Sequence, residues 1–154
     1  MLESLKEYLI LLLGLLIAWL GFRWRKQSRT SPKIIRDELS KSDYKGLVDF
    51  VICQSKHETG NFKSFLAQEK NALFGMGVPI YRKSYRVGEY TANNGEVFSV
   101  YSSKEDSVRD YIEWLKYTRF PTKVDSIEDF AEEIQNRNYA TDPDYEKKLI
   151  KICS

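Results

Sequence analysis

Apolar side chains recur at helical spacing between residues 42 and 60, and the repeat ends at a carboxylate. A recurrence every three or four residues places such side chains on one face of an α-helix. Ser42 or Asp43 is placed to cap the start of this helix, and Gly60 to end it. Its predicted inward face consists of Tyr44, Leu47, Val48, Val51, Ile52 and Ser55. Glu58 follows Ser55 by three residues and is expected at the end of that face.

The predicted position of Glu58 favours acid–base chemistry. A carboxylic acid at a core-facing helix end loses hydration, which raises its pKa and allows it to serve as a general acid. A solvated glutamate at a helix end is the alternative interpretation. The segment 71–77, with the sequence NALFGMG, follows with apolar bulk and two glycines.

The rest of the body predicts short helices and one hairpin. Ser31-Pro32 is typical of a helix start before residues 33–39, and Asp142-Pro143 of a start before the C-terminal residues. Ser103 and Ser126 each precede an aspartate by three residues, which resembles a capping box. Another short helix is expected over residues 61–70. Residues 78–101 predict a small, irregular β-hairpin that turns at Asn93-Asn94-Gly95.

The N-terminal residues predict a membrane anchor. Residues 8–22 carry no charge, and residues 5–24 would form a helix of about 30 Å, enough to span a bilayer. Trp19 and Trp24 are placed to lie near one interface. A cleaved signal peptide is the main alternative, but the start is not positive and no Ala-x-Ala follows. A retained single-pass anchor in residues 1–30, followed by one domain in 31–154, is the favoured organisation.

Net charge argues against nucleic acid as a partner. The chain carries +2, of which residues 1–30 contribute five basic and two acidic side chains, so +3, and the remainder −1. Phosphate binding requires a concentrated basic face, which this body lacks.

The two cysteines and the single histidine limit other chemistry. Cys53 and Cys153 both fall at apolar positions of predicted helices, which favours free buried thiols over a pair. His57 is the only histidine, so the sequence predicts neither a histidine zinc site nor a Ser-His-Asp triad.

Five ordered motifs from residue 53 onward resemble a known enzyme family. They are Glu58-Thr59-Gly60, Asn71-Ala72-Leu73-Phe74-Gly75-Met76, Glu89-Tyr90, Phe98 to Ser103, and Tyr139-Ala140-Thr141-Asp142-Pro143-x-Tyr145. The pattern resembles the peptidoglycan N-acetylglucosaminidases of the flagellar-muramidase and autolysin type, which carry a mannosyl-glycoprotein endo-β-N-acetylglucosaminidase-like domain.

The resemblance implies a mainly α-helical, α+β lysozyme-like fold that cleaves peptidoglycan strands without a metal or other cofactor. It implies cleavage of the β-1,4 bond on the reducing side of N-acetylglucosamine. Carried over, Glu58 is the general acid and Glu89 the second carboxylate, although the sugar acetamido group is an alternative nucleophile. Asp106 and Asp110 are weaker alternatives, for which helix capping and a solvated helix face are preferred.

Four further residues match motifs that the family uses at its cleft. Tyr139 is expected to hydrogen-bond the sugar or its acetamido group, and Phe74 to wall a subsite. Asn71 and Tyr90 belong to the matching segments and are expected to bind substrate as well. Ala72 and Ser99 depart from the Asn and Arg of relatives, which affects substrate contacts more than the reaction.

Alternative functions remain at this stage. A lysozyme or lytic transglycosylase shares the fold and cuts the other glycosidic bond. A non-catalytic, membrane-anchored wall-binding or structural virion protein, or a membrane adaptor, would not cut glycan.

Location is a separate question. The basic residues Arg23 to Arg29 follow the apolar run, which favours a cytoplasmic body, whereas a wall hydrolase must face the wall. The internal membrane of a phage virion, or a bacterial inner membrane with the domain facing the wall, would reconcile these requirements.

Overall fold

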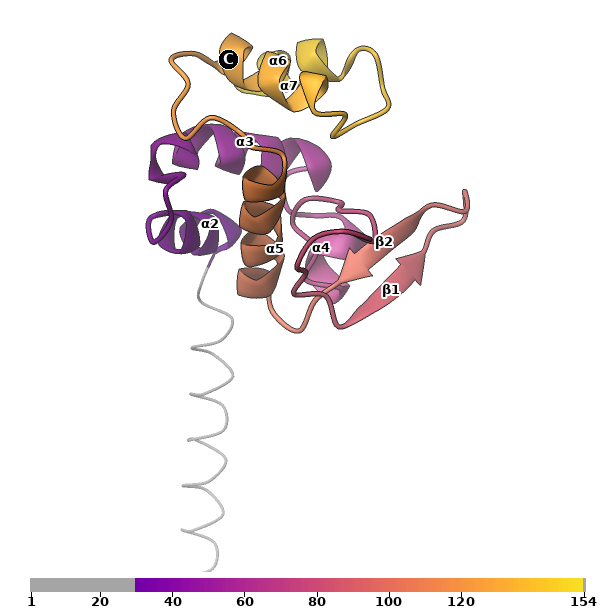
Figure 1. The fold of residues 1–154 in the computed structure, drawn as a ribbon. Coiled ribbons are helices and arrows are strands. Elements are labelled where there is room, and N and C mark those ends of the chain that lie inside the picture. Colours follow the sequence, from indigo (N-terminus) through magenta and orange to yellow (C-terminus); the bar gives the residue numbers. More distant parts are fainter. Residues whose placement is uncertain (1–29, 154) are drawn as a thin grey trace, which may run out of the picture. The chain divides into compact units, whose positions relative to one another are not determined.

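A computed structural model describes residues 30–153 of the chain (Figure 1). The predicted anchor, residues 5–24, lies outside the described residues, so the division of the chain into anchor and domain stays a prediction. Within residues 30–153, no helix has the length and apolar character that a membrane span requires.

The described residues are mainly helical with one two-stranded hairpin, as predicted. The elements are α2 (Ser31–Leu39), the 3-10 helix η1 (Lys45–Leu47), α3 (Val48–Glu58), α4 (Phe65–Glu69), β1 (Gly88–Thr91), β2 (Val97–Val100), α5 (Lys104–Tyr117), α6 (Ile127–Asn136) and α7 (Tyr145–Cys153).

Helix α3 lies at the centre of the helical part. It packs against α2 on one side and α7 on the other, while α6 packs on α7 and α5 on α2 (Figure 1). The hairpin and α4 lie beside α5, away from α6 and α7 (Figure 1). The largest fully buried side chains come from α2, η1, α3, α5, α6, α7 and the segment before the hairpin: Tyr111, Phe74, Phe130, Ile35, Leu39, Leu47, Leu73, Leu115, Ile134, Leu149, Gln54 and Val51.

The predicted inward face of α3 is confirmed, because all six of its residues are buried. The predicted N-cap is wrong. Leu47 occupies the N-cap without a side-chain hydrogen bond, and η1 precedes the helix. The Ser42 hydroxyl instead donates to the Leu39 carbonyl at 2.8 Å and accepts from the Tyr44 amide at 3.2 Å, so it closes the loop after α2.

The two predicted serine N-caps and the hairpin are confirmed. The Ser103 hydroxyl accepts from the Asp106 amide at the start of α5, and the Ser126 hydroxyl from the Asp129 amide at the start of α6. Strands β1 and β2 pair antiparallel, with Glu89 opposite Ser99. Two helices begin later than predicted: α4 at Phe65, after a Ser64 cap, and α7 at Tyr145.

The prediction of two free thiols is wrong. Cys53 and Cys153 form a disulfide between α3 and α7, with their α carbons 5.7 Å apart. Both side chains are only partly buried: Cys53 lies midway along α3, and Cys153 is the last residue of α7. The crosslink closes a loop over a sequence separation of 100 residues.

Candidate active site

Glu58 is the last residue of α3, and the chain turns sharply just after it. Thr59 donates through its hydroxyl to the Ser55 carbonyl at 2.5 Å and accepts from the Phe62 amide at 2.8 Å. Gly60, Asn61 and Phe62 all have positive φ, between 54° and 64°. Such a conformation is uncommon for a bulky residue like Phe62, and it turns the chain away from the helix axis. The carboxyl group therefore projects from a helix end.

The surroundings of Glu58 favour its protonated form. Burial is the largest influence and raises the pKa of Glu58 to about 7, although the hydrogen bond from the Tyr145 hydroxyl lowers it. That hydroxyl donates to Oε1 of Glu58. A carboxyl group with a pKa near neutrality is half-protonated at pH 7, as a general acid requires.

The segment 71–77 passes directly over the carboxyl group. A β carbon built on Gly75 would lie 3.5 Å from Oε2 of Glu58, and the φ of Gly75 is +56°, a conformation that glycine adopts without strain. The Ser55 hydroxyl donates to the Leu73 carbonyl at 2.8 Å, and the Leu73 amide donates to the Ser107 hydroxyl at 3.0 Å. These bonds tie the segment to α3 and α5.

Aromatic rings surround the other side of this segment. The Phe74 ring stacks on Tyr111 with centroids 4.2 Å apart, and Tyr139 lies edge-on to Trp114 at 5.0 Å. The Tyr139 hydroxyl donates to the Phe74 carbonyl. Burial raises the pKa of Tyr139 and of Tyr111 well above the usual value, so both hydroxyls remain hydrogen-bond donors.

A cavity of about 180 Å³ opens beside Gly75. Oε2 of Glu58 approaches the same glycine, although Glu58 is not itself among the lining residues. Backbone from the segment after Phe74 forms one wall, and an aromatic pair with a buried arginine forms another. The lining residues are Gly75, Met76, Gly77, Pro79, Arg82, Trp114, Asn138 and Tyr139.

Asp110 corrects one sequence expectation. It was expected on a solvated helix face, but its side chain is fully buried and forms an ion pair with Arg82, whose side chain is 7 % exposed. Nη1 and Nη2 of Arg82 donate to the carboxylate, at 2.8 and 2.9 Å. The Tyr85 amide and the Tyr101 hydroxyl donate to it as well. Although burial raises the pKa of Asp110, the Arg82 hydrogen bonds and the other donors bring it below the usual value.

The Arg82–Asp110 pair holds the irregular segment before β1 against α5, and Arg82 in turn lines the cavity. The sequence contained a signal for it. Asp110 follows the buried Ser107 by three residues and precedes Trp114 by four, so these side chains share one face of α5. Asp106, in contrast, caps its helix as expected, accepting from Ser102, Ser103 and Arg109.

Glu89 lies apart from this cluster, on β1. Its side chain is 49 % exposed and forms an ion pair with Arg86 at 2.7 Å. Among the contacts that the structure gives for residues 30–153, none joins Glu89 to Glu58. The hairpin therefore presents Glu89 to solvent.

The remaining four candidates from the sequence lie in different surroundings. Phe74 is fully buried, so its ring packs in the core while its carbonyl holds Tyr139. Asn71 has a φ of 55° and donates to the Tyr101 carbonyl at 3.1 Å, which shapes the turn before Phe74. Tyr90 packs on Phe65 with ring centroids 5.3 Å apart. Tyr139 alone of these four lines the cavity.

The other titratable groups offer no obvious metal site in the described part of the chain. No group of three or more His, Cys, Asp or Glu side chains gathers there as metal ligands would. His57 packs edge-on against Tyr145 at 5.2 Å. Burial, together with nearby Lys148, lowers the pKa of His57.

Solved structures share this fold. A peptidoglycan hydrolase from Sphingomonas sp. A1 is 26 % identical, with a TM-score of 0.61, over 77 % of this chain and 83 % of that one. The glycoside hydrolase domain of FlgJ from Salmonella typhimurium is 24 % identical, with a TM-score of 0.54, over 78 % and 79 %. The catalytic domain of the autolysin Auto from Listeria monocytogenes is 21 % identical, with a TM-score of 0.52, over 79 % of this chain and 77 % of that one.

No curated protein sequence matches the chain. A protein family does, and the match extends from residue 34 to residue 154, which includes every element from η1 onward and the greater part of α2. The family is Glucosaminidase, described as mannosyl-glycoprotein endo-beta-N-acetylglucosaminidase. The chain belongs to the Glucosaminidase family.

Proposed function

We propose that the chain is a peptidoglycan hydrolase that cleaves the β-1,4 bond on the reducing side of N-acetylglucosamine, with Glu58 as its general acid. The observation that carries the proposal is the position of the Glu58 carboxyl group, which accepts from Tyr145 at the end of α3 and approaches Gly75 in the wall of the cavity. Burial there raises the pKa of Glu58 to about 7. Family membership supports glycoside hydrolysis, and the likeness to the Sphingomonas peptidoglycan hydrolase supports the wall glycan as substrate.

In the proposed reaction, Glu58 donates its proton to the glycosidic oxygen as the bond to the anomeric carbon breaks. The leaving sugar departs as an alcohol, and water adds to the anomeric carbon and returns a proton to the Glu58 carboxylate, which restores the acid. Glu89 on the hairpin, or the acetamido group of the sugar itself, would stabilise the positive charge at that carbon. Tyr139 in the cavity wall would hydrogen-bond the sugar, and Asn71, Phe74 and Tyr90 would shape the surrounding cleft.

Product analysis tests the proposal. The 154-residue chain is incubated with purified peptidoglycan, the products are reduced, and the new reducing ends are identified by mass spectrometry beside Glu58→Gln. Reduced N-acetylglucosamine ends that disappear in the variant are expected. Muramic acid ends would indicate a lysozyme and anhydro ends a lytic transglycosylase, either of which would overturn the choice of bond. Absence of products from folded protein would favour a wall-binding protein.

The pH dependence of hydrolysis should report Glu58. Because a general acid must be protonated, the rate at limiting substrate is expected to fall about tenfold per pH unit above a midpoint near 7. An unperturbed glutamate would place that midpoint near 4.5. Initial rates of dye release from labelled peptidoglycan between pH 4 and 9 measure it. A midpoint below 5.5 would assign the titration to another group.

The identity of the second carboxylate can be tested by comparing the hydrolytic activities of two variants. Glu89→Gln is expected to lower dye release more than Asp106→Asn, because Asp106 is engaged in capping α5 and pairing with Arg109. Circular dichroism should show both variants folded. The reverse order of activities would move the second carboxylate away from the hairpin.

Membrane attachment forms part of the proposal. We infer that residues 5–24 anchor the domain to a bacterial inner membrane, or to the internal membrane of a phage virion, with the domain facing the wall. The disulfide supports a domain outside the cytoplasm, since disulfides persist in oxidising compartments. Protease treatment of intact spheroplasts tests the orientation: digestion of the domain is expected, and protection would place it in the cytoplasm.

A further inference from the structure

Three buried polar side chains form a row of hydrogen bonds that ends at Glu58. The Tyr111 hydroxyl donates to Oε1 of Gln54, Nε2 of Gln54 donates to the Tyr145 hydroxyl at 3.1 Å, and that hydroxyl donates to Oε1 of Glu58. Gln54 and Tyr111 are fully buried, and Tyr145 is 4 % exposed. Polar groups this deep in a core are costly unless each is paired, and here each has a partner.

The direction of these hydrogen bonds follows from the number of hydrogens. A tyrosine hydroxyl has one hydrogen, and that of Tyr145 is used on Glu58. Its oxygen must therefore accept from the amide nitrogen of Gln54, which turns the amide oxygen toward Tyr111. The chain of donors thus runs from Tyr111 through Gln54 and Tyr145 to one oxygen of the carboxyl group.

The two oxygens of Glu58 are consequently unequal. Oε1 accepts from Tyr145, so the proton of the neutral acid belongs on Oε2. Oε2 is the oxygen that approaches Gly75, and Gly75 lines the cavity. We propose that Tyr145 is a positioning residue, which, supported by Gln54 and Tyr111, directs the proton of Glu58 onto Oε2, the oxygen beside the cavity-lining Gly75. This inference rests on the proposed function of Glu58 as the general acid.

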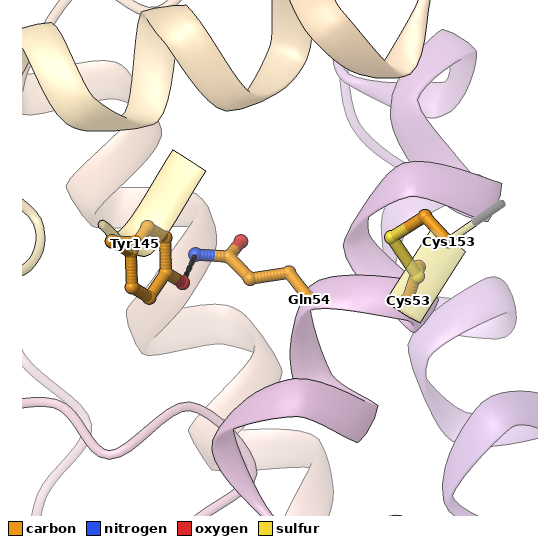
Figure 2. The surroundings of a disulfide bond; sticks show 4 residues. All are labelled: Cys53, Gln54, Tyr145 and Cys153. Carbon is orange, nitrogen blue, oxygen red and sulfur yellow. Dashed lines mark hydrogen bonds between the residues drawn. A yellow bond between two sulfur atoms is a disulfide. The ribbon is translucent and has the colours of Figure 1, made fainter. Parts of the chain in front are cut away.

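The disulfide reinforces the same arrangement. Gln54 and Glu58 lie on α3 and Tyr145 on α7, so the line of bonds depends on how these two helices pack. Figure 2 shows Gln54 reaching toward Tyr145 at one end of α7, while Cys53, its neighbour, is bonded to Cys153 at the other end. The short helix is therefore held against α3 at both of its ends.

A test must leave the other titratable groups near these hydrogen bonds unchanged. Tyr139 and Tyr111 interact electrostatically with Glu58, and His57 packs on the Tyr145 ring. The charge of Lys148 lowers the pKa of His57, and that of Asp142 raises it. A variant that removes only the Tyr145 hydroxyl leaves all five in place.

The test is Tyr145→Phe, assayed by dye release across pH. Because the lost hydrogen bond favours the ionised carboxylate, its removal should move the alkaline limb of the rate profile to higher pH, by half a unit or more. The plateau rate should fall by about half, because the proton is then shared between Oε1 and Oε2. Tyr111 is the first donor of the row, so Tyr111→Phe should move the alkaline limb of the rate profile in the same direction but by a smaller amount.

Tyr44→Phe is the matched control, since Tyr44 is also buried, at 5 % exposure, but packs near α2 and η1. It should leave both the plateau and the limb unchanged. A Tyr145→Phe profile that keeps the wild-type limb, whatever its plateau, would overturn the positioning role and leave the proposed function intact. A wild-type chain without hydrolytic activity would instead overturn the proposed function. Thermal unfolding at one pH verifies that each variant is folded.

Discussion

Replacing Glu58 by glutamine is expected to reduce peptidoglycan hydrolysis by about 10²–10⁴-fold, the usual contribution of a general acid. Glutamine has nearly the same shape and can still accept from the Tyr145 hydroxyl through its amide oxygen. It cannot release a proton to a leaving group. Dye release at pH 6, where the wild-type carboxyl group is mostly protonated, gives the largest contrast between the two proteins.

The stability of the same variant separates a chemical loss from a folding defect. Burial raises the pKa of Glu58 from 4.5 to about 7, so the folded state holds more protons than the unfolded state between those values. Stability therefore falls as pH rises through that window, and the contribution of the neutral group is fully present only below pH 4.5. Glutamine stays neutral, so Glu58→Gln should be at least as stable as wild type at pH 8.

Urea unfolding at pH 5 and at pH 8 measures this relation. The variant should gain stability relative to wild type as pH rises from 5 to 8. A variant that is inactive and also less stable at pH 8 would indicate a structural role for Glu58. A folded variant with wild-type hydrolysis would remove Glu58 from the reaction.

Features that depend on neighbouring residues could be predicted from the sequence. The apolar repeat over residues 44–55 identified six buried residues, and the capping serines Ser103 and Ser126 located the starts of two helices. The Asn-Gly signal located the hairpin turn, where Gly95 has a φ of +86°. In each case the determining residues lie within one or two turns of the structure they produce, so local spacing is sufficient.

Features that join distant segments could not be predicted in the same way. The residues of the Arg82–Asp110 pair are 28 positions apart, those of the Gln54–Tyr145 bond 91, and the cysteines 100. Periodicity shows which face of a helix is buried but not which distant segment covers it. Cys53 was therefore correctly placed on α3 while its partner was missed. The bond of Tyr145 to Glu58 likewise depends on the packing of α7 on α3.

Among the proposed substitutions, those that remove the disulfide are expected to lower the free energy of unfolding the most. Closing a loop of this length restricts the unfolded chain, and for a loop of about 100 residues that restriction is worth ~4–5 kcal/mol. The total stability of a domain of this size is about 5–15 kcal/mol. A protein with Cys53→Ser and Cys153→Ser together should therefore unfold at a much lower urea concentration than the oxidised wild type.

Reductant provides the matched comparison, because it should lower the urea midpoint of the wild type toward that of the double variant and leave the variant unchanged. Titration of thiols in urea without reductant should find none in the wild type. Two free thiols, or equal urea midpoints for both proteins, would contradict the crosslink. Hydrolysis should decline along with stability, because α7 carries Tyr145 and its position on α3 sets the hydrogen bond to Glu58. Loss of stability with full activity below the unfolding midpoint would show that core packing alone keeps α7 in place.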